Sequence, residues 1–240
     1  MTQHTTMKSP SRNPASAMSV EEAILTRKSV RRFLPNPVPR ETIEHLLALA
    51  SRAPSGVNAQ PWRVYVIGGR ALQGLSDALV EAHFNAPDDH QPEVQSSPDR
   101  LPEPYKSRQR EVGWALYGLL GIEKGDREAT LAQHARNYRF FGAPTGLIFT
   151  MDKTLKTGSW LDYGLFLQTL MLAARGQGLH TCPQVAFAKY HRIIREHLSI
   201  PEHEYVVCGM SLGTVDPSAP ENSLETPREP VAGFATFLDQ

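Results

Sequence analysis

The sequence predicts a sandwich-like α+β domain, and two observations lead to that class. Apolar runs that suit buried strands lie at 64–67, 145–151 and 205–212. The segments between them carry helical spacings of apolar residues, so the strands are too few for a regular series of alternating strands and helices. A length of 240 residues fits one sizeable domain or two small ones. We expect a single domain over 19–240.

The helices are predicted from caps, prolines and amphipathic spacing. Ser19-Val20-Glu21-Glu22 has the spacing of a capping box and opens a short helix that runs into Arg27. Prolines at 35, 37 and 39 force an extended connector before a helix over 40–52. Further helices are expected at about 70–84, 105–124, 126–138, 158–177 and 186–198. The helix over 158–177 is apolar nearly all round, which predicts burial on several sides and indicates a subunit interface.

Three segments are expected to lie outside the regular elements. Residues 1–18 are rich in Ser, Thr, Asn and Pro without the apolar centre of a secretory signal, so we expect a flexible tail. Residues 85–104 hold five prolines, and so long an irregular segment is typical of a functional flap or a mobile loop. The chain is again rich in proline before its end, and we expect 215–240 to form a C-terminal arm.

Composition excludes several classes of function. The 25 basic and 25 acidic residues balance, so the chain as a whole is not an electrostatic binder of nucleic acid. No apolar stretch reaches the length of a membrane span. Cys182 and Cys208 lack metal-ligand spacing, and two lone buried thiols fit a reducing cytoplasm. The nine histidines form no HExxH or His-x-His pattern, so no metal site is expected.

The segment 53–62, APSGVNAQPW, carries more information than any other. It joins an amphipathic helix to a strand, where a plain connection needs only a few residues. Its small residues let a ligand approach the backbone, and Ser55, Asn58 and Gln60 offer donors and acceptors to a planar polar ring. A helix stop followed by a turn explains the same residue types. The segment by itself is therefore compatible with a ligand-binding loop and with a structural turn.

A basic cluster without acidic residues extends from Ala23 to Arg40. In a helix or turn, Arg27 and Arg31 lie on one face, where a bound anion relieves their repulsion. Ser29 adds a hydroxyl donor, and arginine suits bidentate contact with phosphate. A solvated basic face or a weak RNA patch are the alternatives. Only Phe33 offers a stacking aromatic in the cluster, so a single phosphate on a small ligand is favoured.

Four segments, in this order, resemble the motifs of the FMN-dependent nitroreductase family. They are TRKSVRRF at 26–33, PSGVNAQPW at 54–62, GLHTCPQ at 178–184, and GMSLG at 209–213 followed by Arg228. The resemblance covers about 19–238 and is closest to the nitrobenzoate and nitroaromatic reductase branch. It implies a nitroreductase-like α+β fold with a central, mainly antiparallel sheet flanked by helices. It also implies a homodimer with two FMN sites, each built by both chains, and a C-terminal arm that embraces the partner subunit.

The resemblance implies a set of cofactor-binding residues. Arg27, Ser29 and Arg228 bind the FMN phosphate, Lys28 contributes mainly backbone or ribityl contacts, and Arg31 approaches the N1/O2 edge of the flavin. Reduced flavin is anionic there, so Arg31 stabilises it. Ser55 and Asn58 contact the ring from the partner side, while Pro183, Gln184 and Val185 place backbone groups near N5 and O4. Pro54 and Gly213 complete the set. Gln184 stands where the best-known branch has an acid, a departure that bears on substrate preference.

The resemblance implies an oxidoreductase that uses NADPH or NADH to reduce nitroaromatic compounds by two-electron ping-pong hydride transfer. The flavin carries the chemistry, so no catalytic side chain is expected. Trp114 and Tyr117 are candidate aromatic covers of the substrate, with ordinary core packing as the alternative. Competing hypotheses are the same flavin fold reducing quinones, enones or halogenated phenols, and a flavin-binding protein without turnover.

Overall fold

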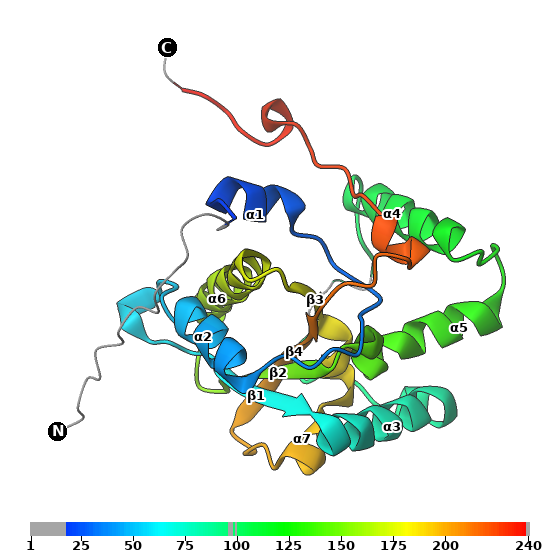
Figure 1. The fold of residues 1–240 in the computed structure, drawn as a ribbon, viewed down its shortest axis with the longest axis horizontal. Coiled ribbons are helices and arrows are strands. Elements are labelled where there is room, and N and C mark those ends of the chain that lie inside the picture. Colours follow the sequence, from blue (N-terminus) through cyan, green and yellow to red (C-terminus); the bar gives the residue numbers. More distant parts are fainter. Residues whose placement is uncertain (1–17, 96–97, 99, 239–240) are drawn as a thin grey trace.

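The structure is a computed structural model that describes residues 18–95, 98 and 100–238 (Figure 1). The predicted tail therefore lies outside the described residues, apart from Met18. One four-stranded sheet forms the centre of the fold, in the order β1-β2-β4-β3. Its strands are β1 (Arg63–Gly68), β2 (Thr145–Asp152), β3 (His180–Gln184) and β4 (Glu204–Gly213). All three pairings are antiparallel, which confirms the predicted sheet.

Strand β3 was not predicted, because its sequence HTCPQ contains a proline and no apolar alternation. The strand forms at the edge of the sheet, where its residues pair with β4 from His180 opposite Gly213 to Gln184 opposite Gly209. An edge strand tolerates Pro183, because the missing N–H leaves a ladder bond unmade only on one side. Tertiary pairing, not local propensity, decides this element.

Seven α-helices surround the sheet in the described part of the chain. They are α1 (Val20–Thr26), α2 (Arg40–Ala50), α3 (Gly69–Asn85), α4 (Tyr105–Leu119), α5 (Arg127–Ala135), α6 (Thr157–Gly176) and α7 (His191–Leu198). The capping box is confirmed, since the Ser19 hydroxyl accepts from the backbone N–H of Glu22 at 3.0 Å. The helix predicted over 126–138 ends at Ala135, and a 3-10 segment, Arg136–Gly142, follows with Phe140 and Phe141 at positive φ. The helix predicted over 186–198 begins only at His191, after a 3-10 segment.

Helices cover both faces of the sheet (Figure 1). Leu147, Phe149 and Met151 of β2 belong to the core cluster that includes α2 and α6. Ile148 belongs to a second cluster, formed with α3, α7 and the 3-10 segments that precede α7 and β2. This alternation follows from the two-residue period of a strand, which sends successive side chains to opposite faces. The sheet is thus held between two apolar layers.

Helix α6 packs only one of its faces into this core. Tyr163, Phe166 and Leu170 are fully buried, whereas Leu161 is 70% exposed and Leu165 is also exposed in the single chain. Trp62 stacks on Phe166 with ring centroids 4.7 Å apart, so the end of the segment 53–62 packs against this helix. The sequence predicted burial of this helix on several sides, but in the single chain one apolar face of α6 stays exposed.

Candidate cofactor site

The basic segment 27–33 leaves α1 in an extended conformation. Arg27 is the C-cap of α1, with φ −67° and ψ 123°, so the helical interpretation of Arg27 and Arg31 was wrong. Buried Val30 and Phe33 anchor the segment in the core. The N–H of Val30 donates to the carbonyl of Thr181 at 3.1 Å, which places the segment along β3. Tertiary pairing with β3 therefore overrides the helical spacing of the cations.

The cations of this segment line a cleft of about 890 Å³. Arg27, Lys28, Ser29 and Arg31 form one wall, and Arg228 reaches the same cleft from the C-terminal arm. Arg175 of α6 adds a fifth cation, against a single carboxylate, Glu225. Such an excess of positive charge around a concave surface favours an anionic ligand. The structure thus brings together five of the predicted cofactor residues.

Arg175 was missed by the sequence reasoning, because only the fold shows that this arginine near the end of an apolar helix is buried. Its guanidinium donates to the Thr26 hydroxyl at 3.2 Å and to the carbonyl of Leu179 at 3.2 Å. Burial lowers the pKa of Arg175, and Glu22 acts in the opposite direction. Among the described residues, no carboxylate forms an ion pair with it. Its charge therefore adds to the field of the cleft.

His180 is the second residue that the sequence reasoning did not assign to the cleft. Burial, with the nearby charges of Arg175 and Lys28, lowers the pKa of His180 to about 4. Its Nδ1 atom is buried and has no hydrogen-bond partner in the described structure. His180 is therefore neutral at pH 7, and its ring presents polar atoms without adding charge.

Acidification is expected to destabilise the flavin-free protein through His180. Its pKa of about 4 in the folded chain lies below the ordinary value of 6.5, so the unfolded chain binds more protons between these values. The stability that neutral His180 contributes is present above pH 6.5 and is lost as the pH falls toward 4. Urea unfolding at pH 7 and pH 5 measures this loss. His180→Gln should lose less stability over that interval than the wild type, while the exposed-site control His203→Gln should match the wild type. Equal losses in the wild type and His180→Gln would contradict the assignment.

The segment 53–62 forms a tight, ordered turn beside α6 and contributes nothing to this cleft in its own chain. The N–H of Gly56 donates to the buried carboxylate of Asp162 at 3.1 Å, and the Ser55 hydroxyl accepts from the N–H of Gln60 at 3.0 Å. Val57, Asn58 and Gln60 adopt positive φ, and Val57 is fully exposed. A β-branched residue at positive φ is strained. The turn interpretation is confirmed, and Pro54, Ser55 and Asn58 stay predicted contacts to a ring held by a partner chain.

The residues expected near the flavin N5 lie at the end of β3. The Gln184 side chain points inward, donating from Nε2 to the carbonyl of Asn137 at 2.7 Å and accepting from the Ser211 hydroxyl at 2.7 Å. A carboxylate there cannot donate to Asn137, so these partners give the departure from an acid a structural reason. The backbone roles of Pro183, Gln184 and Val185 stay predictions. Gly213 pairs with His180 and leaves room for Pro144, whose ring would lie 2.8 Å from an added Cβ.

Helix α4 carries both candidate substrate covers on the surface of the chain. Trp114 is exposed and meets Tyr117 edge-on with centroids 6.1 Å apart. The Tyr117 hydroxyl lies 3.0 Å from Nε2 of His134. No residue of α4 is buried, so the alternative of core packing was wrong for Trp114.

Two further observations restrict the chemistry and the setting of the described residues. They contain no cluster of three or more His, Cys, Asp or Glu side chains able to hold a metal ion. Cys182 and Cys208 are free and buried, and burial raises the pKa of their thiols to about 11 and about 12. Within the same residues, no helix has the length and apolarity needed to cross a membrane.

Comparison with known proteins identifies a family and several relatives of this chain. A model described as the Nitroreductase family matches residues 24–214. The chain is 45% identical over 218 residues to the 4-nitrobenzoate reductase of Pseudomonas putida, covering 91% of this chain and 95% of that protein. It is 42% identical to the nitrobenzene nitroreductase of Ectopseudomonas oleovorans, covering 92% and 97%.

Comparison with solved structures identifies nitroreductases as well. The crystal structure of the FMN and NADPH-dependent nitroreductase NfnB from sphigopyxis sp. strain HMH superposes with a TM-score of 0.89 at 35% identity, covering 92% of this chain and 100% of that chain. The family model spans all four strands of the sheet, the basic segment and the segment 53–62. The chain belongs to the nitroreductase family.

Proposed function

We propose that the protein is an FMN-dependent oxidoreductase that uses NADPH or NADH to reduce nitroaromatic compounds. The cationic cleft around the basic segment is the observation that carries the proposal, because it supplies a built anion site where the family motif lies. Relatives that cover nearly the whole chain are named for the reduction of 4-nitrobenzoate and nitrobenzene. The structural relative NfnB is described as FMN- and NADPH-dependent.

The residues of the cleft fit FMN. Arg27, Ser29 and Arg228 offer charged and hydroxyl donors to the phosphate. The Lys28 ammonium donates to the backbone carbonyl of Asn222, so its side chain is already engaged, in line with the backbone or ribityl role predicted for it. Bound FMN supplies the hydride-transfer chemistry. The chain supplies binding, orientation and a positive charge at Arg31, which favours the reduced, anionic ring electrostatically.

The exposed apolar face of α6 supports a homodimer. Leu161 and Leu165 of α6 and Val20, Ile24 and Leu25 of the adjacent α1 are all exposed in the single chain. Contiguous apolar patches of this kind mark interaction sites, and a second copy of the chain offers a self-complementary surface. Ile24 and Leu25 also line the cationic cleft, so the site and the dimer face adjoin.

Leu161→Arg is expected to produce a monomer that binds FMN weakly, because a buried guanidinium without a partner opposes burial of this face. Light scattering coupled to gel filtration gives the mass, and flavin fluorescence gives the affinity. Leu131→Arg on α5 is the matched control, since Leu131 is exposed but lies on another helix. A Leu161→Arg protein of unchanged dimeric mass would contradict this interface.

The C-terminal arm supports an exchange between protomers. Phe234, Phe237 and Leu238 are exposed in the single chain, with Phe237 at 73%, and the arm extends away from the body (Figure 1). An ion pair between Arg108 and Glu229 holds the arm to α4 before these residues. A largely apolar cleft of about 630 Å³ lies beside the edge strand β1, with Val66 in its lining. We place the arm of one protomer against this edge of the other, because an uncovered strand edge invites pairing.

The two free, buried thiols support a cytoplasmic location, where cysteines stay reduced. A cytoplasmic protein also has direct access to reduced nicotinamide. Fusion to a fluorescent protein and fractionation of the cells tests this assignment.

A purified, dialysed sample tests the function itself. The protein is expected to be yellow with the absorbance of a flavin, to bleach on anaerobic addition of NADPH, and to recover its colour when 4-nitrobenzoate or nitrobenzene is added. Menadione added in place of the nitroarene compares a quinone as acceptor. A colourless protein that fails to bind added FMN would refute the proposal, and bleaching without recovery by either nitroarene would refute the substrate class.

A further inference from the structure

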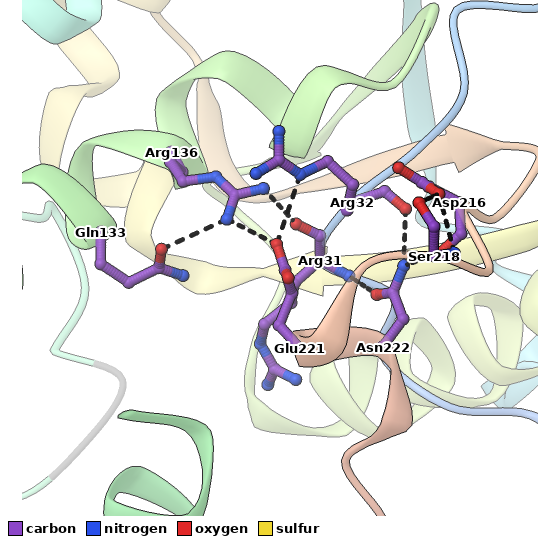
Figure 2. A network of polar contacts seen from close by, with 8 residues as sticks. All are labelled: Arg31, Arg32, Gln133, Arg136, Asp216, Ser218, Glu221 and Asn222. Carbon is purple, nitrogen blue, oxygen red and sulfur yellow. Dashed lines mark hydrogen bonds and ion pairs between the residues drawn. The ribbon is translucent and has the colours of Figure 1, made fainter. Parts of the chain in front are cut away.

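A buried polar pair, Glu221 and Asn222, lies just before Leu224 and Glu225, which line the cationic cleft. After β4 the chain enters a short 3-10 turn, Pro220–Ser223, in which Glu221 is 1% and Asn222 is 5% exposed (Figure 2). The function does not use these side chains directly. Buried polar groups of this kind persist only where their hydrogen bonds are made, so their partners show what they hold.

Asn222 binds the backbone of the basic segment. Its Oδ1 accepts from the N–H of Arg31 at 2.8 Å, and its Nδ2 donates to the carbonyl of Arg32 at 2.8 Å. The same Nδ2 donates to the carbonyl of Asp216 at 2.9 Å, which ties the amide to the segment after β4. One side chain therefore satisfies two backbone groups of the basic segment (Figure 2).

Arg136 binds the carbonyl of Arg31, the residue whose N–H donates to Asn222. Its Nη2 donates to the carbonyl of Arg31 at 2.7 Å, and its Nη1 pairs with the Glu221 carboxylate at 2.7 Å. Glu221 also pairs with Arg32 at 3.4 Å. Burial alone raises the pKa of Glu221, but the two guanidinium groups lower it overall, so the carboxylate stays charged and holds Arg136 in place.

The backbone N–H and carbonyl of Arg31 are thus both fixed by side chains from elsewhere in the fold. Two fixed backbone groups set the direction in which the side chain leaves the chain. The Arg31 guanidinium donates to the carbonyl of Ser29 at 3.2 Å and lines the cleft. A charge displaced by even a small distance loses part of its stabilisation of a nearby anion, because the interaction energy falls with distance.

We infer that Asn222 and Arg136 are positioning residues that aim the Arg31 guanidinium at the N1/O2 edge of FMN and thereby raise the reduction potential of the bound flavin. The inference rests on the proposed function. It adds that the start of the C-terminal arm and the 3-10 segment after α5 set the electronic properties of the site, although neither Asn222 nor Arg136 lines the cleft. A merely structural role for the pair weakens the binding of oxidised and reduced flavin equally and leaves the potential unchanged.

The test compares flavin potentials in the holoprotein, by anaerobic dye equilibration, with FMN dissociation constants by fluorescence quenching. Arg31→Ala is expected to lower the preference for reduced over oxidised flavin about tenfold, which for a two-electron couple is about 30 mV. Asn222→Ala should shift the potential in the same direction by at least about threefold, or about 14 mV by the same conversion. The double variant should shift no further than Arg31→Ala alone, because both changes act through one guanidinium.

A second variant covers the case in which Asn222→Ala does not fold. Arg136→Lys keeps a positive charge opposite Glu221 but removes the fork that reaches the carbonyl of Arg31, and it should give a shift of the same sign. Asn36→Ala, in the exposed connector before α2, is the matched control and should keep the wild-type potential.

The outcomes separate the two claims. Shifts by Arg31→Ala together with Asn222→Ala or Arg136→Lys support the inference. A shift by Arg31→Ala without one in either positioning variant, or an additive double variant, overturns it and leaves the proposed function intact. A wild-type protein that binds no flavin defeats the proposed function instead.

Discussion

Arg27→Ala and Arg228→Ala are each expected to weaken FMN binding by about 10- to 150-fold. A hydrogen bond to a charged group contributes about 1.5–3 kcal/mol, and about 1.4 kcal/mol corresponds to a factor of ten. Both residues line the cationic cleft, from opposite ends of the sequence. Arg228 donates only to the neighbouring Thr226 and Pro227 in the described structure, so a phosphate does not compete with an ion pair for it. Quenching of FMN fluorescence on titration with flavin-free protein measures the change.

Arg139→Ala is the control for this pair of variants. Arg139 is an exposed arginine that pairs with Asp77 on α3, outside the cleft, and its loss removes the same charge from the protein. FMN affinity should then match the wild type. An Arg139→Ala variant as weak as Arg27→Ala would mean that net charge, not the cleft, governs binding. Unchanged affinity in both cleft variants would remove Arg27 and Arg228 from the phosphate site.

Gly209→Ala is expected to destabilise the fold by about 2–3 kcal/mol, the upper part of the range for overpacking a core. A Cβ at Gly209 would lie 2.4 Å from the ring of Phe187. That ring is fully buried and packs on Phe140 with centroids 4.5 Å apart, so it has no room to move. For a domain of this size the cost corresponds to a fall in the melting temperature of about 4–12 °C, which calorimetry measures.

A double-variant cycle identifies the cause of this loss. Phe187→Leu combined with Gly209→Ala should cost less than the sum of the two single changes, because the smaller side chain admits the added methyl group. Gly74→Ala on α3 is the control glycine, since an added Cβ meets nothing within 4 Å there. It should stabilise the protein by up to about 1 kcal/mol through helix propensity. Additive costs in the cycle would show that the ring contact is not the source.

Local signals predicted most of the helices, because they depend on neighbours in the sequence. The box that begins at Ser19 caps α1, and the prolines before Arg40 precede α2 as expected. These local signals failed for segments whose hydrogen-bonding partner is distant in the sequence. The HTCPQ strand exists only through β4, and the basic segment is extended because it pairs with Thr181. The spacing of cations along the sequence could not reveal that pairing.

The residues of the candidate site also divide into those that the sequence predicted and those that it missed. Arg27, Ser29 and Arg31 were predicted from one short motif, and Arg228 from its place after the final strand. Arg175 was missed, because an arginine near the end of a helix indicates nothing until the fold buries it beside Thr26. Asn222 was missed as well, since a single asparagine in a proline-rich segment has the composition of an ordinary turn.

The sequence by itself determined the class of fold, a cluster of cations suited to a phosphate, and the small, polar segment 53–62. These follow from residue type and short-range spacing, which the chain carries wherever it folds. Only the tertiary structure decided how those groups are aimed, since Arg31 takes its direction from Asn222 and Arg136, each about 100 or more residues away along the chain. Direction depends on hydrogen bonds between distant segments, and the amino-acid pattern around Arg31 contains no record of them.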